Sequence, residues 1–376
     1  MAGLKIAVLG GGNGAFATAA DLSLQGHEVR LWSRSLSTIE SLLKTRKIKV
    51  SGPLMTAEAE LAHVTTDIAE AVKEADLLCS PLPAFAQLSV AKALGPHLVD
   101  GQVIFLPPGS FGTVLMADHF RKGNLWKNIA LAETGTLPYL ARKNGPNEIG
   151  IVVRACHLPT GVFPARHTTW AIERIRQAFH SVHPVENALS GALMNAGPII
   201  HSPLIVLNTG PIEHRAPYDI HNEGTTPGIR KVVRALDQER ILVREALGFK
   251  PNHYPLEDYF DDTRPNEWMY PRTTKKLLIE SGFWREEIGY HHRYVTEDIA
   301  CGLAFLVSVA DYAGVEVPAA RSLLTLAGVV AGVDYMKEGR TLGSFGLKSL
   351  AKPELFRFLE EGWEISAGTV KSTERG

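Results

Sequence analysis

A histidine and an aspartate in the second half of the sequence have contexts that favour proton transfer. His201 lies in the otherwise apolar stretch NAGPIIHSPL, residues 195–204, where a polar ring needs a hydrogen-bond partner. Asp298 opens an apolar segment that has Gly302 one helical turn further on. A carboxylate beside a buried imidazole orients the ring and raises its basicity. We therefore interpret His201 and Asp298 as a catalytic dyad. The alternative is a satisfied buried pair without chemistry.

A glycine loop near the N-terminus has the spacing that binds the pyrophosphate of a dinucleotide. It matches G-x-G-x-x-A and consists of Gly10, Gly11, Gly12, Asn13, Gly14 and Ala15. The first glycine permits a sharp turn, the second lets the backbone approach the pyrophosphate, and the alanine allows close packing of a helix on a strand. The apolar run 4–9 precedes the loop, a helix is expected over 15–25, and 27–32 is expected to be the second strand. This βαβ context favours a dinucleotide site over a simple glycine-rich turn.

The residues after the second strand bear on the choice of cofactor. An acid at this point would accept hydrogen bonds from the ribose 2′-OH and favour NAD. Instead, Ser33, Arg34 and Ser35 follow Trp32. The guanidinium of Arg34 offers several donors to a 2′-phosphate, and the serines can add hydrogen bonds. The sequence thus favours NADP, with NAD possible. The alternative is that Arg34 is a solvated surface residue.

A proline-rich turn, composed of Pro81, Leu82 and Pro83, follows the strand expected over 76–80. The turn at 107–110 follows the strand expected over 102–106 in the same way. The nicotinamide half of a dinucleotide lies at the carboxyl ends of such strands. Both segments are therefore candidate cofactor contacts, although either could be only a turn.

The elements that must position these residues fall into two groups. Up to about residue 186, short apolar strands alternate with helices and Pro/Gly turns, which predicts a doubly wound, mainly parallel sheet. From residue 187 the apolar periodicity becomes helical, with helices expected over 229–247, 297–313 and 319–331. We expect an α/β Rossmann domain over 1–186 and a mainly α-helical catalytic domain over 187–376.

Two stretches are not expected to be regular. Residues 251–272 are rich in Pro, Asp and aromatics and predict an irregular loop or lid between helices. The tail after residue 366 is expected to be disordered.

The composition argues against several classes of partner. Lys plus Arg number 39 and Asp plus Glu 40, so the net charge of −1 gives no general attraction to nucleic acid or an anionic membrane. The sequence indicates no signal peptide and no membrane-spanning run. Cys79, Cys156 and Cys301 form no CxxC pair, which argues against a disulfide framework and a metal site. We expect a cytoplasmic protein, and the long apolar helices make a homodimer plausible.

These motifs together resemble those of a known family, the opine dehydrogenases of the NAD/NADP octopine and nopaline dehydrogenase group. The resemblance covers nearly the whole chain. It rests on the glycine loop, Glu133-Thr134, N-x(5)-H at 195–201, E-G-x-T-P at 223–227, R-Y-x-x-E-D at 293–298 and E-G-R-T-L at 338–342.

The resemblance implies a reaction. Such enzymes condense the amino group of an amino acid with an α-keto acid and reduce the C=N bond with NAD(P)H. His201 would handle the proton, and Asp298 would hold the imidazole. The resemblance also places Glu133 among the cofactor contacts.

The implied substrates carry carboxylates, which need cationic partners. Arg293, next to the acidic pair, is the preferred candidate, ahead of Arg142 and Arg215. Further candidate substrate contacts are Asn195, Thr226, His214 and, with less support, His221.

Two other functions remain open. Glycerol-3-phosphate dehydrogenases and ketopantoate reductases also join a Rossmann domain to a helical domain, and they typically rely on a catalytic lysine. Lys275 and Lys276 are the candidates for that role, but their polar surroundings indicate solvated side chains. A module that senses NADP without catalysis is the second alternative. The His201 and Asp298 pair argues against both.

Overall fold

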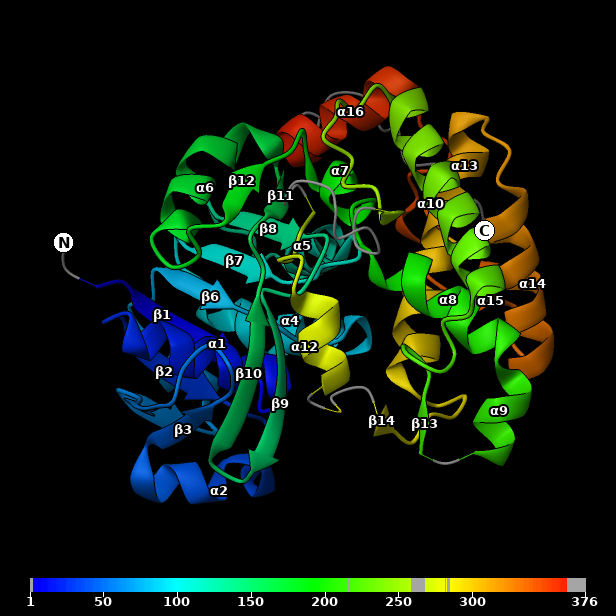
Figure 1. The fold of residues 1–376 in the computed structure, drawn as a ribbon. Coiled ribbons are helices and arrows are strands. Elements are labelled where there is room, and N and C mark those ends of the chain that lie inside the picture. The colour runs from blue at the N-terminus through cyan, green and yellow to red at the C-terminus, as the bar shows by residue number, and fades with distance from the viewer. Residues whose placement is uncertain (1–2, 216, 258–267, 281, 283–284, 364–376) are drawn as a thin grey trace.

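The computed structural model describes residues 3–215, 217–257, 268–280, 282 and 285–363. One half of the molecule is a sheet covered by helices, and the other half is a group of long helices (Figure 1). The predicted fold class, a doubly wound and mainly parallel α/β domain followed by a mainly helical domain, is confirmed. The division between residues 186 and 187 stays a prediction.

The main sheet has eight strands, and all but one neighbouring pair is parallel. In spatial order they are β12 (Val182–Pro184), β11 (Leu158–Phe163), β8 (Ala130–Thr134), β7 (Val103–Leu106), β6 (Leu77–Cys79), β1 (Lys5–Leu9), β2 (Glu28–Trp32) and β5 (His63–Thr65). Only β11 and β8 run antiparallel. At the centre of the sheet, β6 and β7 are apolar and buried along their whole length because helices cover both faces.

The helices of this half follow the strands in alternation. They are α1 (Asn13–Leu24), α2 (Leu36–Thr45), α3 (Ile68–Val72), α4 (Gln87–Leu94), α5 (Gly112–Lys122) and α6 (Thr168–Arg176), with short 3-10 turns η1 (Ala84–Ala86), η2 (Gly95–His97) and η3 (Ala165–His167). The predicted strand–helix–strand unit at the N-terminus corresponds to β1, α1 and β2.

A second sheet was not expected from the sequence. It contains β4 (Ala57–Glu60), β3 (Lys47–Ser51), β10 (Glu148–Arg154) and β9 (Tyr139–Gly145), in that order. The long β9–β10 pair crosses in front of α1 in Figure 1. Charged residues alternate with buried ones in β3, so the sheet turns one face to solvent and packs the other on α1.

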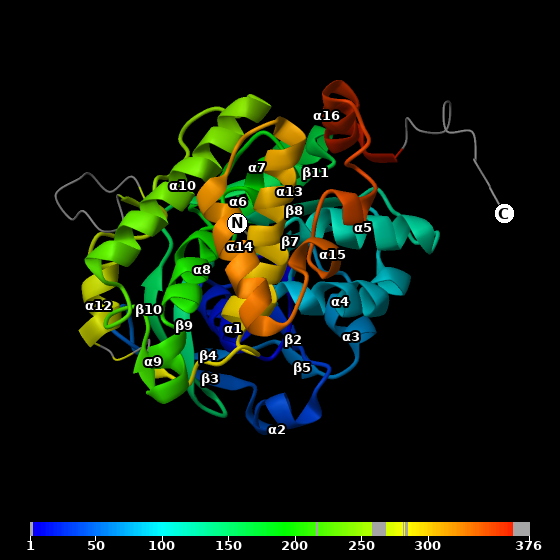
Figure 2. The same cartoon turned by 90° about the vertical axis from the view of Figure 1, so that its right-hand side faces the viewer.

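The helical half contains α7 (Ala188–Ala192), α8 (Gly197–Leu207), α9 (Thr209–His214), α10 (Pro227–Leu247), α12 (Thr274–Glu280), α13 (Ala304–Ala313), α14 (Pro318–Ala331) and α15 (Tyr335–Glu338), with the 3-10 turn η5 (Gly343–Phe345). A short pair, β13 (Tyr218–Asp219) and β14 (Arg285–Glu286), lies beside them. Figure 2 faces this half.

The predicted helix 297–313 is not one regular α-helix. Its first part belongs to a π-helix, η4 (Tyr294–Leu303), which continues into α13. Wider π turns inside α-helices are frequent at functional sites. Residues 229–247 and 319–331 lie in α10 and α14 as expected.

The lid predicted over 251–272 lies partly outside the described residues, and the tail after 366 lies wholly outside them. The last described helix, α16 (Lys352–Glu361), returns to the first half, where the ring of Phe358 lies 5.2 Å from that of Phe163 on β11. Among the described residues, one helical stretch, Ala188–Leu207, could cross a membrane by length and composition. However, 83% of it is buried inside the protein, as in a core helix.

Candidate active site

Two close contacts between helices bring His201 and Asp298 together. His201 lies on α8, and Asp298 lies on η4. A Cβ atom on Gly197 would overlap Oδ1 of Asp298, and one on Gly302 would overlap the ring of Pro198. The two helices can therefore approach this closely only because both positions are glycine.

The two side chains form a buried hydrogen-bonded pair. Nδ1 of His201 lies 2.7 Å from Oδ2 of Asp298. The imidazole is 14% exposed, and the carboxylate is 5% exposed. Burial raises the pKa of Asp298 above its ordinary value, and the nearby Arg293 and His292 oppose that rise. The carboxylate thus holds the imidazole at one of its two ring nitrogens.

An aromatic residue that was not singled out from the sequence covers one face of the imidazole. The ring of Tyr294 stacks on that of His201 with centroids 3.7 Å apart. Its hydroxyl lies 3.0 Å from Nε2 of His221, which in turn packs edge-on against His201. Tyr294 belongs to the R-Y-x-x-E-D motif, so the signal was present in the sequence without indicating the stacking.

The pair opens into a pocket of about 670 Å³ between the two halves of the molecule. Its lining comes from the first half, from α8 and the turn before it, from the turn after β13, from the segment 268–270, and from η4 and the residue before it. The lining residues are Pro108, Thr136, Leu137, Leu140, Asn195, Ala196, Gly197, Ile200, His201, His221, Trp268, Tyr270, Arg293 and Asp298.

The predicted substrate residues divide between this pocket and the surface. Asn195 and Arg293 line it, and so does His221, which had less support. Thr226 does not line the pocket. It is exposed and caps α10, where its hydroxyl accepts a hydrogen bond from the N–H of Ile229 at 3.4 Å. His214 is exposed on α9, where Nδ1 lies 3.0 Å from the carbonyl oxygen of Gly210.

Arg293 is the one arginine among the described lining residues. Its side chain is 45% exposed, and its Nε lies 3.6 Å from Oε2 of Glu297. Arg142 and Arg215 do not line the pocket, and Arg215 is 70% exposed. No lysine lines the pocket in the described part of the chain, and Lys276 is 76% exposed.

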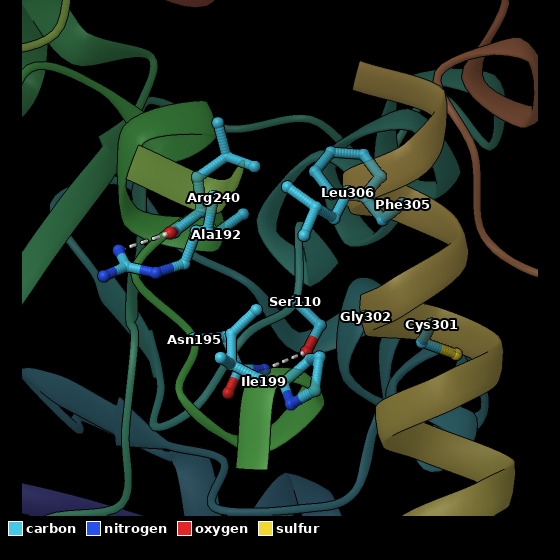
Figure 3. A pocket seen from close by; sticks show the side chains of 11 residues that line it. Ser110, Ala192, Asn195, Ile199, Arg240, Cys301, Gly302, Phe305 and Leu306 are labelled. Atoms are coloured by element: carbon cyan, nitrogen blue, oxygen red, sulfur yellow. Dashed lines mark hydrogen bonds between the residues drawn. The ribbon is translucent and has the colours of Figure 1, made fainter. Parts of the chain in front are cut away.

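Asn195 ties the helical half to the first half, as Figure 3 shows in the adjoining pocket of about 300 Å³. Its amide donates to the hydroxyl of Ser110 at 2.9 Å, and its carbonyl oxygen accepts from the N–H of Gly197 at 3.0 Å. Ser110 belongs to the turn after β7, so this contact sets the start of α8 against that turn.

The glycine loop and the turn after β6 lie against each other. Gly10 has a φ of 135° and would place a Cβ against the side chain of Leu82, while Gly14 faces Pro81. Gly12 faces open space, with no heavy atom within 4 Å of a Cβ added there. The N-terminus of α1 is thus accessible where a pyrophosphate would sit.

Of the other predicted cofactor contacts in the loop, Asn13 and Ala15 have structural roles as well. The side-chain oxygen of Asn13 accepts from the backbone N–H of Lys143 on β9 at 3.0 Å, so it joins the loop to the second sheet. Ala15 is fully buried beneath the loop.

Three polar residues follow β2 at the same edge of the main sheet. Ser33 is buried, and its hydroxyl lies close to where a Cβ on Gly11 would be. Arg34 and Ser35 are exposed, and Arg34 makes no hydrogen bond or ion pair with the described residues. A guanidinium is therefore available beside the glycine loop.

The carboxylate of Glu133 accepts hydrogen bonds from within the protein. Oε1 accepts from the N–H of Phe111 at 2.7 Å, and Oε2 accepts from the N–H and the hydroxyl of Thr113 at 3.0 and 2.8 Å. Burial raises the pKa of Glu133, and these hydrogen bonds oppose the rise. The side chain holds the turn before α5 in place, and any cofactor contact would be additional.

Two charged residues of the helical half reach the turns after β6 and β7. Oε1 of Glu297 accepts from the N–H of Ala84, which follows Pro83, at 3.1 Å. The guanidinium of Arg340 donates to the carbonyl oxygens of Gly109, Ser110 and Ala84 and to the side-chain oxygen of Gln87. Sequence reasoning missed both, because the partners of each lie at least 213 positions away along the chain.

Comparison with known proteins agrees with this division into halves. Residues 184–331 match the family model of the NAD/NADP octopine/nopaline dehydrogenase α-helical domain. Residues 5–109 match that of the NAD-dependent glycerol-3-phosphate dehydrogenase N-terminus. An opine dehydrogenase from Arthrobacter sp. (strain 1C) is 28% identical over 92% of this chain and 95% of its own length. The chain is therefore similar to the opine dehydrogenases over nearly its whole length.

Other relatives are similar over the same extent. A vitopine synthase from Allorhizobium ampelinum is 26% identical over 91% of this chain and 95% of its own length. Octopine dehydrogenase solved with NADH and L-arginine has the same fold, with a TM-score of 0.69 and 18% identity over 95% of this chain and 98% of its own. The chain is an NAD(P)-dependent oxidoreductase that resembles the opine dehydrogenases.

Proposed function

We propose that this protein is an opine dehydrogenase, which condenses an amino acid or amine with an α-keto acid and reduces the resulting C=N bond with NAD(P)H. The change would thus occur at a CH–NH group. The observation that carries the proposal is the hydrogen-bonded pair of His201 and Asp298, 2.7 Å apart, at the wall of a pocket between the two halves. Solved relatives described with NADH together with L-arginine, agmatine or pyruvate support the substrate classes.

The residues of the first half fit a dinucleotide. The N-terminus of α1 is accessible beside Gly12, and the turn with Pro81 and Leu82 packs against the same loop. We assign the pyrophosphate to residues 10–15 and the nicotinamide side to the turn that includes Pro83. When bound, the dinucleotide supplies the hydride that reduces the C=N carbon.

His201 would move the proton in the condensation. Its Nδ1 is engaged by Asp298, so Nε2 would accept a proton from the ammonium group of the donor, and the free amine would then attack the keto carbon. The same nitrogen would return that proton to the hydroxyl as it leaves as water. The product of these steps is an iminium ion, which becomes a secondary amine on reduction.

Asp298 would keep the imidazole oriented and stabilise its protonated form. A carboxylate in this position acts by holding the ring in one tautomer. Arg293 would pair with a substrate carboxylate at the same wall of the pocket, because a guanidinium binds a carboxylate through two parallel hydrogen bonds. Asn195 would position α8 and thereby His201.

We further propose a preference for NADP over NAD. The exposed guanidinium of Arg34 and the hydroxyls of Ser33 and Ser35 lie after β2, beside the glycine loop. They offer donors to a 2′-phosphate in place of the acid that would bind a ribose 2′-OH. Yersinopine dehydrogenase, a solved relative with a TM-score of 0.64, is described with NADP⁺ bound.

The test is a substrate matrix followed by one substitution. Purified protein is mixed with NADPH, pyruvate and each of a panel of amino acids, and NADPH consumption is followed by absorbance. Consumption that requires both substrates, together with a secondary amine identified by mass spectrometry, supports the proposal. Reduction of the keto acid alone to a hydroxy acid would contradict it.

His201→Gln should lower kcat by roughly 100- to 10,000-fold, which is the usual range for loss of a general acid–base. NADPH affinity, measured by fluorescence titration, should not change. His97→Gln is the matched control because His97 is exposed on η2, in the first half. Full activity of the His201 variant would remove the proposed role of the imidazole.

A further inference from the structure

The pocket beside His201 is lined by a polar set and an apolar set of side chains, which we call the polar wall and the apolar wall. The polar wall contains His201, Asp298, Arg293 and Asn195. The apolar wall combines Leu137 and Leu140, which follow β8, with Ile200 on α8 and the rings of Trp268 and Tyr270. The two rings lie against each other, with centroids 5.2 Å apart.

The hydroxyl groups of Tyr270 and Thr136 already form hydrogen bonds within the protein. The hydroxyl of Tyr270 lies 2.9 Å from that of Thr136 and donates to the carbonyl oxygen of Leu137. Burial raises the pKa of Tyr270, so the phenol stays neutral. The tyrosine therefore contributes ring surface to the pocket, and its polar atom is turned toward the first half.

The described lining residues offer a cationic ligand little electrostatic stabilisation. Among the described residues that line the pocket, the one carboxylate is Asp298, and it is hydrogen-bonded to His201. A lysine- or arginine-like side chain on the apolar wall would lose its hydration without gaining an anion. An anionic side chain would compete with the substrate carboxylates for Arg293.

We propose that the amino donor of this enzyme carries an apolar side chain, aliphatic or aromatic, that lies on the wall formed by Leu137, Leu140, Ile200, Trp268 and Tyr270. This inference rests on the proposed function, because it names the donor class of the same site. The donor carboxylate and amine contact the polar wall, and the side chain makes van der Waals contact with the rings and aliphatic groups of the apolar wall.

The experiment compares donors at fixed pyruvate and NADPH. L-leucine and L-phenylalanine are set against L-lysine, L-arginine and L-glutamate. We expect kcat/KM for the two apolar donors to exceed that for each charged donor by at least roughly tenfold, since the charged groups would be desolvated without a partner. Equal or faster turnover of a charged donor overturns the inference and leaves the proposed function standing. Turnover of no donor at all contradicts both.

A substitution on the apolar wall tests the location. Leu140→Glu places a carboxylate there, so kcat/KM for L-leucine should fall by roughly tenfold and that for L-lysine should rise. Leu140→Ala, which is the more conservative change, should lower kcat/KM for L-leucine several-fold without improving L-lysine. If neither variant changes the ratio of kcat/KM for L-leucine to kcat/KM for L-lysine, the apolar wall does not contact the donor side chain and the proposal fails.

Leu242→Glu is the matched control, because Leu242 is 43% exposed on α10 and does not line the pocket. Its donor preference should equal that of the unmodified chain. NADPH affinity, measured on each variant, reports whether the first half is intact. A variant of Leu140 that binds NADPH normally but changes donor preference supports the assignment to the wall.

Discussion

The ring of Tyr294 lies almost parallel to the imidazole of His201, with centroids 3.7 Å apart and planes inclined by 18°. The hydrogen bond to Asp298 holds one ring nitrogen of the imidazole, whereas the ring of Tyr294 covers one of its faces. His221 holds the hydroxyl of Tyr294 in turn, at 3.0 Å. The imidazole thus has contacts that restrict both tilt and rotation, which is what proton transfer at a defined atom needs.

Removal of this stack should lower activity more than removal of the tyrosine hydroxyl. Contacts between aromatic rings contribute about 0.5–1.5 kcal/mol beyond burial, so Tyr294→Leu should lower kcat by roughly threefold to tenfold. Tyr294→Phe keeps the stack and should retain most of kcat. The measurement is kcat at saturating substrates, with thermal unfolding as the check on the fold. A larger loss for the phenylalanine variant would show that the hydroxyl, not the stack, is what matters.

Removal of the Arg34 guanidinium should weaken the binding of NADPH but not that of NADH. In Arg34→Ala we expect KM for NADPH to rise roughly tenfold, since an exposed charge-assisted contact to a phosphate is worth about that much at moderate salt. KM for NADH should stay the same, because NADH has no 2′-phosphate. Arg357→Ala, on the exposed side of α16, is the control. An equal rise for both cofactors would place Arg34 away from the 2′-phosphate.

The buried carboxyl of Glu297 should make stability depend on pH. Burial raises its pKa from 4.5 to about 7, Arg293 opposes the rise and Asp298 adds to it. Between these two pH values the folded chain binds more protons than the unfolded chain. The free energy of unfolding should therefore fall as pH rises from about 4.5 to about 7.

Glu297→Gln should remove this contribution, because its side-chain oxygen can still accept from the N–H of Ala84 without carrying a charge. Above pH 7 the variant should be more stable than the unmodified chain by roughly 1–3 kcal/mol, and near pH 4 the two should be alike. Urea denaturation across this range measures the difference. In both proteins the free energy of unfolding should still fall somewhat as pH rises, because burial also raises the pKa of Asp298. Parallel curves for the two proteins would contradict the assignment.

Arg340 should connect the two halves. It is 9% exposed, and its donors are shared among Gly109, Ser110, Ala84 and Gln87, all in the first half. Arg340→Met leaves these buried acceptors without their donor, which should cost roughly 1–3 kcal/mol of the free energy of unfolding.

Because the same acceptors belong to the turns after β6 and β7, the Arg340 variant should also have a lower kcat. Arg357→Met, at an exposed site on α16, should change neither quantity. A variant at Arg340 that loses stability but keeps full kcat would show that the contact holds the fold and does not position the site.

The glycine loop could be predicted from the sequence because its physics is local. A strand, a tight turn with Gly10 and Gly12, and a helix follow one another within a few residues, and each residue type is required by a neighbour in the chain. The alternation of strands and helices predicted the fold class for the same reason. The second sheet was missed because its strands pair 49–51 with 148–150, and no local pattern indicates such a partner.

The buried context of His201 predicted that it needs a partner, but the identity of that partner depends on packing across 97 positions of sequence. Only the tertiary structure brings α8 and η4 together at Gly197, stacks Tyr294 on the imidazole and leaves Thr226 and His214 outside the pocket. Short-range spacing determines which turns and helices form. The composition of a pocket depends instead on which distant surfaces meet, and in this protein those surfaces belong to two different halves of the chain.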